Sequence, residues 1–179
     1  MKLDGILTRQ SDGSHVVTFD RVIDRPVAKV WAALTDERIL KNWLGNVEVE
    51  LRVGGKFAIQ FREITVSMTG TITALEPERV LEYSWFEENG LSQSLLRWEL
   101  VPDGGGCRLK LIHRFPPGVK VRDMTAFLGG WEAYLNVFVR GVDGEFVSYS
   151  DQNEAEIAAG YRARHAKELA AEDEAAKDR

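Results

Sequence analysis

Apolar and polar residues alternate in seven short runs of this chain, a pattern typical of β-strands that bury one face. The first run covers residues 15–23, and six more lie between residues 47 and 115. Only short links separate those six runs, whereas a parallel crossover would need about a dozen residues or more. The pattern therefore predicts antiparallel strands at residues 15–23, 47–51, 56–61, 67–76, 80–85, 94–101 and 107–115.

Four links between these strands carry residues that favour tight turns. They are Gly54-Gly55, Glu76-Pro77-Glu78, Asn89-Gly90 and Asp103 to Gly106. The first pair also raises the question of a phosphate-binding loop, which follows a strand and opens a helix. Strand pattern lies on both sides of Gly54-Gly55, and neither GxGxxG nor GxxxxGK followed by Ser or Thr occurs in the chain. We therefore predict a hairpin, in which glycine supplies positive φ without steric cost.

A helical period of about 3.6 residues replaces the alternation elsewhere. Proline suits the first turn of a helix, so Pro26 marks the start of a short helix. Asp36 can cap a second short helix, which Gly45 ends. A longer helix is predicted over residues 122–140, and its apolar face carries Met124, Phe127, Leu128, Trp131, Leu135 and Phe138.

Gly129-Gly130 lies inside this long helical pattern, where each glycine costs about 1 kcal/mol relative to alanine. Either the helix breaks there and restarts at Trp131, or the glycines allow its backbone to approach the sheet or a ligand closely. We favour the close approach. The nearby carboxylates of Asp123 and Glu132 are interpreted as solvated charges.

The chain divides into three parts by pattern. Residues 1–14 form an N-terminal extension, residues 15–145 form the domain, and residues 146–179 form a charged, partly helical tail. The tail is rich in Ala, Glu, Lys and Arg, and Ile157, Tyr161 and Leu169 make only a narrow apolar stripe. We therefore expect the tail to add little to the core.

Composition narrows the range of partners. A net charge of −5 and a pI of about 5.3 argue against nucleic acid or an anionic membrane, since both favour a basic surface. Cys107 is the single cysteine, which excludes an internal disulfide and suits a reducing cytosol. The first residues lack the basic-then-apolar order expected of a secretory signal, and no apolar run approaches the roughly 20 residues of a membrane helix. We expect a cytoplasmic protein without membrane insertion.

Motifs for catalysis or metal binding are weak. Cys107 and His113 share a strand face, but six residues at about 3.3 Å each place them roughly 20 Å apart. The two side chains therefore cannot bind the same metal ion. The chain contains no GxSxG motif. We therefore expect no metal and no cofactor.

His113 is in phase with the apolar residues of its strand and should face inward. It is either a core histidine with one satisfied hydrogen bond or a polar anchor or general base in a pocket.

Aromatic residues form the larger signal, because several lie on the inward faces of predicted strands and of the long helix. They make either a solid core or the lining of a ligand cavity.

The order of one strand, two short helices, a run of antiparallel strands and a long helix resembles the helix-grip fold of the SRPBCC superfamily. That superfamily includes START lipid-transfer domains, polyketide cyclases and birch-pollen-allergen-like proteins. "RPVAKVWAALTDERILKNWL" and "VEVELRVGGKF" resemble the first helix pair and the first hairpin of its activator of heat-shock protein 90 ATPase homologue 1-like branch. "GTITALEPERVLEYSW", "CRLKLIHRF" and "GGWEAYLNVF" are similar to the branch's later strands and Trp-bearing helix. The resemblance covers residues 16–141.

The resemblance implies an α+β fold in which a curved, seven-stranded antiparallel sheet wraps around the long C-terminal helix. Two short helices would lie between the first and second strands, and a cavity between sheet and long helix. A curved sheet that grips a helix tends to leave such a hollow, so we favour the cavity over a solid core. The resemblance does not imply one activity, because a shared fold does not determine function.

Our interpretation is a protein that binds a small, largely apolar molecule in this cavity. One alternative is a cyclase- or hydratase-like enzyme that uses His113 and pocket water, and another is an interaction module that modulates a chaperone. A homodimer is also left open. The residues predicted to contact the ligand are Phe57, Ile59, Tyr83, Trp85, Trp98, His113, Phe127 and Trp131.

Overall fold

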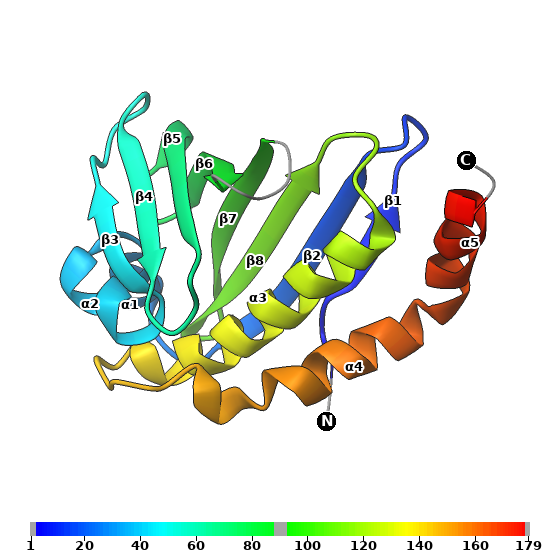
Figure 1. The fold of residues 1–179 in the computed structure, drawn as a ribbon. Helices are drawn as coiled ribbons and strands as arrows, with labels where there is room; N and C mark the ends of the chain where they lie inside the picture. The colour runs from blue at the N-terminus through cyan, green and yellow to red at the C-terminus, as the bar shows by residue number, and fades with distance from the viewer. Residues whose placement is uncertain (1–2, 88–92, 178–179) are drawn as a thin grey trace.

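A computed structural model describes residues 3–87 and 93–177 (Figure 1). The predicted Asn89-Gly90 turn lies outside these residues. Within them, one antiparallel sheet of eight strands has the order β1-β2-β8-β7-β6-β5-β4-β3. The strands are β1 (Ile6–Arg9), β2 (His15–Ile23), β3 (Gly45–Val49), β4 (Lys56–Phe61), β5 (Ser67–Glu76), β6 (Val80–Glu87), β7 (Ser94–Asp103) and β8 (Gly106–Phe115).

The predicted count of seven strands is therefore one too low. The seven predicted strands correspond to β2–β8, and the additional strand β1 belongs to the N-terminal extension. It pairs with β2 from Ile6 opposite Thr18 to Arg9 opposite His15. Because β1 is only four residues long and largely exposed, its apolar and polar residues carry no clear alternation.

Helices α1 (Val27–Thr35) and α2 (Glu37–Trp43) link β2 to β3, as predicted. The Asp36 side chain caps α2 by accepting a hydrogen bond from the backbone N–H of Arg38 at 2.9 Å. Gly45 does not end this helix: Leu44 is its C-cap, and Gly45 opens β3. The side chain that glycine lacks would lie 2.3 Å from the carbonyl oxygen of Gln60 on β4, so close strand pairing requires glycine here.

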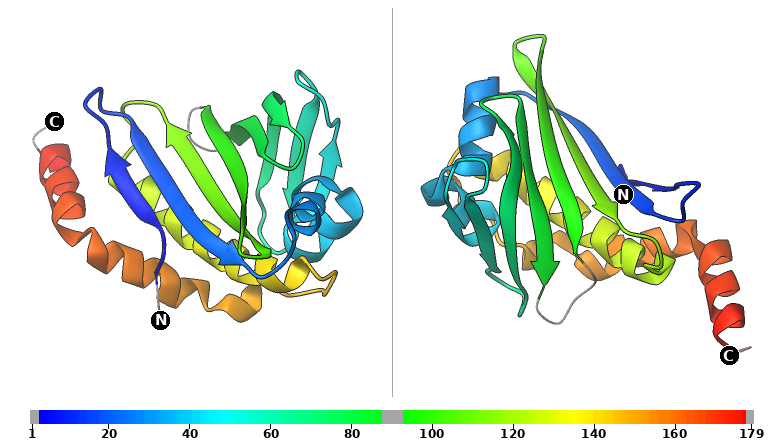
Figure 2. Two further views of the ribbon diagram at one scale, coloured as in Figure 1. Left: turned by 180° about the vertical axis from the view of Figure 1, so that it is seen from behind. Right: turned by 90° about the horizontal axis from the view of Figure 1, so that it is seen from above.

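The long helix α3 (Val121–Gly141) crosses one face of the curved sheet, and α4 (Glu154–Arg164) runs along α3 (Figure 1). A short 3-10 helix (Ser150–Gln152) precedes α4, and α5 (Ala166–Lys177) follows it. Figure 2 shows α3 and α4 on the same side of the sheet, with α1 and α2 near β3. No helix among the described residues combines the length and apolar character that a bilayer crossing requires.

The hairpin predicted at Gly54-Gly55 is confirmed, because β3 and β4 pair antiparallel on either side of it. The loop covers residues 50–55 and is longer than a two-residue turn. Only Gly54 has a positive φ, at 80°. Gly55 is required for another reason: a Cβ there would lie 2.1 Å from the carbonyl oxygen of Glu50.

Helix α3 continues without a break through Gly129-Gly130. A Cβ on Gly129 would lie 3.4 Å from the Cα of Ala158 on α4, which is an ordinary van der Waals distance. A Cβ on Gly130 would meet no atom within 4 Å. The predicted close approach to the sheet is therefore wrong, because Gly129 faces a helix of the tail at an ordinary contact distance and Gly130 faces open space.

The tail contributes to the core, contrary to the sequence-based expectation. Ile157 and Tyr161 of α4 have exposed fractions of 1% and 0%. Glu172 of α5 accepts a hydrogen bond from the backbone N–H of Val121 at 2.6 Å and so caps the start of α3. The apolar stripe of α4 is narrow, but its two buried residues, Ile157 and Tyr161, both belong to the hydrophobic core.

Glu132 on α3 is also buried, with an exposed fraction of 1%, and is not the solvated charge expected from sequence. Its carboxylate accepts hydrogen bonds from the Asp4 backbone N–H at 2.9 Å and from the Tyr161 hydroxyl at 2.5 Å. It also forms an ion pair with Arg21 of β2. Glu132 thus joins the N-terminal segment, the sheet and α4 at one point.

Candidate functional site

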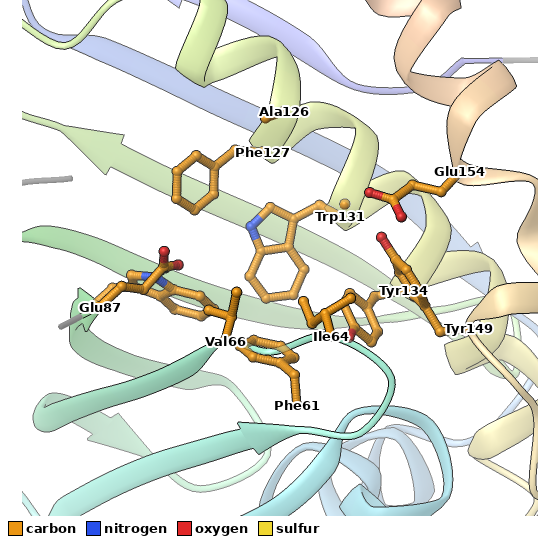
Figure 3. Close-up of a pocket in the computed structure, with 12 residues that line it drawn as sticks. Phe61, Ile64, Val66, Glu87, Ala126, Phe127, Trp131, Tyr134, Tyr149 and Glu154 are labelled. Atoms are coloured by element: carbon orange, nitrogen blue, oxygen red, sulfur yellow. Dashed lines mark hydrogen bonds between the residues drawn. The ribbon is translucent and has the colours of Figure 1, made fainter. Parts of the chain in front are cut away.

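A pocket of about 230 Å³ lies between α3 and the β4–β5 hairpin (Figure 3). Six of its lining side chains are aromatic, and most of the remainder are apolar. The lining consists of Phe61, Ile64, Val66, Trp85, Glu87, Ala126, Phe127, Gly130, Trp131, Tyr134, Tyr149 and Glu154. Its position between sheet and long helix is the position predicted for the cavity.

Trp131 projects from α3 into the middle of this group (Figure 3). Its ring centroid lies 5.5 Å from that of Trp85 on β6, in an edge-to-face arrangement. Phe61, at the end of β4, lies 5.9 Å from Trp85 and 5.4 Å from Tyr134 by ring centroid. These separations are typical of interacting aromatic pairs, so the rings support one another around the pocket.

The remaining wall of the pocket is formed by Tyr149 and Glu154, which belong to the segment after α3. Hydrogen bonds to the β4–β5 link hold this segment in place. Glu63, in the β4–β5 link, accepts hydrogen bonds from the backbone N–H groups of Tyr149 at 3.0 Å and Ser150 at 2.8 Å. The Ser148 hydroxyl donates a third at 2.7 Å. Burial alone would raise the pKa of Glu63, but these hydrogen bonds outweigh it and lower the pKa to about 2. An ionised Glu63 therefore holds Tyr149 against the pocket.

Three of the eight residues predicted as ligand contacts line the pocket, and they are Trp85, Phe127 and Trp131. The other five, Phe57, Ile59, Tyr83, Trp98 and His113, are fully buried in the packed interior. Phe57 stacks on Tyr83 at a centroid distance of 4.0 Å, and the Trp98 indole N–H donates to the Tyr83 hydroxyl at 3.2 Å. For this group the solid-core interpretation agrees with the packing.

His113 faces inward, as its strand phase predicted, and its exposed fraction is 0%. The Trp131 indole N–H lies 3.2 Å from Nδ1, and the Ser94 hydroxyl lies 2.8 Å from Nε2. Because an indole only donates, Nδ1 is the acceptor and Nε2–H donates to Ser94. Burial lowers the pKa of His113 to about 3, so the ring is neutral at physiological pH. His113 fixes the position of Trp131 by accepting its indole hydrogen bond from the sheet side, and it is not one of the residues that line the pocket.

The buried imidazole should make stability depend on pH. The unfolded chain binds a proton near the ordinary pKa of 6.5, whereas the folded chain does so only near 3. Stability is therefore complete above about 6.5 and is lost as the pH falls, by up to about 1.4 kcal/mol per pH unit. We expect His113→Gln to flatten the loss between pH 6.5 and 4.5, as measured by urea unfolding. Phe115→Leu, a neighbouring core substitution without a titratable group, should keep the wild-type slope. Equal slopes for His113→Gln and the wild type would contradict this prediction.

Sequence reasoning missed several lining residues. Phe61 alternates with Phe57 and Ile59 along its strand, so strand phase could have identified it as an inward-facing residue. Ile64 and Val66 lie in a link between strands, where strand phase gives no direction. Tyr149 and Glu154 lie beyond the long helix, and only the path of the tail brings them to the pocket.

A curved antiparallel sheet that grips a long helix, with an aromatic pocket between them, defines a helix-grip protein of the SRPBCC superfamily. The sequence profile described as activator of Hsp90 ATPase homolog 1-like protein matches residues 24–142. The chain belongs to this family. The predicted resemblance is thereby confirmed.

Solved structures show the same fold. CalU16 from Micromonospora echinospora is 24% identical, with a TM-score of 0.67 over 88% of this chain and 92% of that one. EF2215 from Enterococcus faecalis is 17% identical, with a TM-score of 0.71 over 91% of each chain. DynU16, a protein of the dynemicin biosynthetic locus, is 20% identical, with a TM-score of 0.66 over 76% of this chain and 49% of its own. No curated protein matches the chain in sequence.

Proposed function

We propose that this protein binds a small, largely apolar molecule in the pocket between α3 and the β4–β5 hairpin. The observation that carries the proposal is the lining itself, in which six aromatic rings surround a hollow that is not filled by side chains. Concave, mainly apolar sites with a few polar groups are the usual form of small-molecule sites. The single, buried cysteine supports a reducing, cytoplasmic location.

Binding accounts for the site better than catalysis through His113. A general base must reach its proton, directly or through one water. The imidazole is fully buried, and its partners, Ser94 and Trp131, are not ionisable near neutral pH. The large apolar side chains that are exposed include Ile6 on β1, Leu51 and Val53 in the β3–β4 loop and Phe86 on β6, and none of these four lines the pocket.

Gly130 allows the proposal to be tested without damaging the core. A side chain at this position would enter the pocket and meet no atom within 4 Å at its Cβ. Leucine is a better helix former than glycine by roughly 0.5–1 kcal/mol. We expect Gly130→Leu to fold with equal or greater stability and to bind an apolar fluorescent probe at least about tenfold more weakly than the wild type, a loss of about 1.4 kcal/mol.

Gly129→Ala is the matched control, because it makes a similar change in helix propensity on the neighbouring residue, which faces Ala158 and lies outside the pocket lining. It should bind the probe as the wild type does. The proposal fails if the wild type binds no apolar probe, or if Gly130→Leu binds as tightly as Gly129→Ala.

A further inference from the structure

We infer that the pocket selects a ligand with an apolar, preferably aromatic, body and a positively charged end, such as an organic ammonium ion. This inference rests on the proposed function and specifies the chemical class of its ligand. It follows from the charges, the aromatic faces and the origin of the residues that border the pocket.

The charged groups of the lining are both acidic. Glu87 and Glu154 border the pocket, and none of its lining residues, all of them described, is Lys, Arg or His. Residues 88–92, which follow Glu87 and lie outside the described part, have the sequence Glu-Asn-Gly-Leu-Ser and include no basic residue. Figure 3 shows the two carboxylates on opposite sides of the pocket, with Trp131 between them.

An anionic ligand would be disfavoured in such a site. A carboxylate or phosphate end would lie near two like charges with no basic side chain among the lining to pair with it. Like charges placed together and charges buried without a partner both weaken binding. Fatty acids and phosphorylated lipids therefore fit this lining poorly, although their apolar parts would match it.

A cation gains from the same arrangement in two ways. An ammonium group can pair with either carboxylate, and it is attracted to the faces of aromatic rings within about 6 Å of it. Glu154 lies beside Tyr149 at the pocket. Burial and the nearby Glu154 carboxylate raise the pKa of Tyr149, so its hydroxyl stays neutral. Glu87 accepts a hydrogen bond from the Trp85 indole at 2.8 Å, which fixes its carboxylate at the edge of an aromatic ring of the lining.

Part of this selectivity comes from outside the family match. The matched segment ends at residue 142, whereas Tyr149 and Glu154 follow it. Glu63 holds Tyr149 through the hydrogen bonds described above. The C-terminal segment thus adds one acidic side chain and one aromatic ring to a pocket that the family domain otherwise forms.

The test compares three ligands that share one body: 2-(naphthalen-2-yl)ethylamine, 2-(naphthalen-2-yl)ethanol and naphthalene-2-acetate. Binding to the full chain is measured by titration calorimetry at pH 7 and low salt. We expect the amine to bind about tenfold or more tightly than the acetate, with the alcohol between them. Because Glu154 is exposed, salt should reduce the difference.

Glu154→Gln should reduce the ratio of amine to acetate affinity by about threefold or more, and Glu87→Gln should act in the same direction. Glu174→Gln, which removes the same charge from the exposed surface of α5, should leave the ratio unchanged. Alcohol and acetate binding equal to amine binding would overturn this inference and leave the proposed function intact. If none of the three ligands binds, both fail.

Discussion

Replacing Glu132 by alanine is expected to lower the free energy of unfolding by about 3–5 kcal/mol, because it removes one partner of a buried ion pair. Arg21 would keep its charge beside the emptied position, with Asp4 at 3.5 Å and the Asn136 side chain at 2.9 Å as its partners. The Tyr161 hydroxyl and the Asp4 backbone N–H would also lose their acceptor. Urea unfolding followed by tryptophan fluorescence measures the change.

Two further variants separate the buried charge from the individual hydrogen bonds. Tyr161→Phe removes the hydrogen bond to Glu132 and the one that the hydroxyl accepts from the Gly5 backbone N–H at 2.8 Å, and should cost about 1–3 kcal/mol. Glu174→Ala, on the exposed surface of α5, should change stability by less than about 0.5 kcal/mol. A cost below about 1 kcal/mol for Glu132→Ala would show that this cluster does not hold the N-terminal segment and α4 to the domain.

Truncation after Ser150 is expected to destabilise the domain strongly. The change exposes the surface that α4 covers and removes Ile157 and Tyr161, each contributing about 1.5–3 kcal/mol by burial. It also leaves Glu132 without the Tyr161 hydroxyl. For a chain of this length, a loss of about 5 kcal/mol corresponds to a fall in melting temperature of roughly 10–20 °C. Thermal unfolding followed by circular dichroism measures it.

A shorter truncation serves as the control. Ending the chain after His165 removes α5, which has no buried residue, and keeps all of α4. The main loss is the cap that Glu172 provides to α3, which is worth about 1 kcal/mol, or a few degrees. Similar melting temperatures for the two truncated chains would contradict the role that we assign to α4.

The pocket shows where sequence reasoning succeeds and where it stops. Trp85, Phe127 and Trp131 were found because strand phase and helix phase both state which side chains face inward. The same rule placed Trp98 and His113 inward, also correctly, but it cannot separate a side chain that borders a hollow from one packed behind it. That difference depends on the curvature of the sheet and on the angle at which α3 crosses it.

Local pattern by itself determined the antiparallel strands β2–β8, the two short helices, the long helix and the β3–β4 hairpin, because periodicity and turn chemistry depend on neighbours in the chain. Only the tertiary structure decided what Glu132 and Gly129 do, since their partners are Arg21 on β2, Tyr161 on α4 and Ala158 on α4. It likewise brought Tyr149 and Glu154 to the pocket through the contact of Glu63 with residues 148–150. Contacts between residues far apart in the chain leave no periodic signal, and they set the shape and charge of this site.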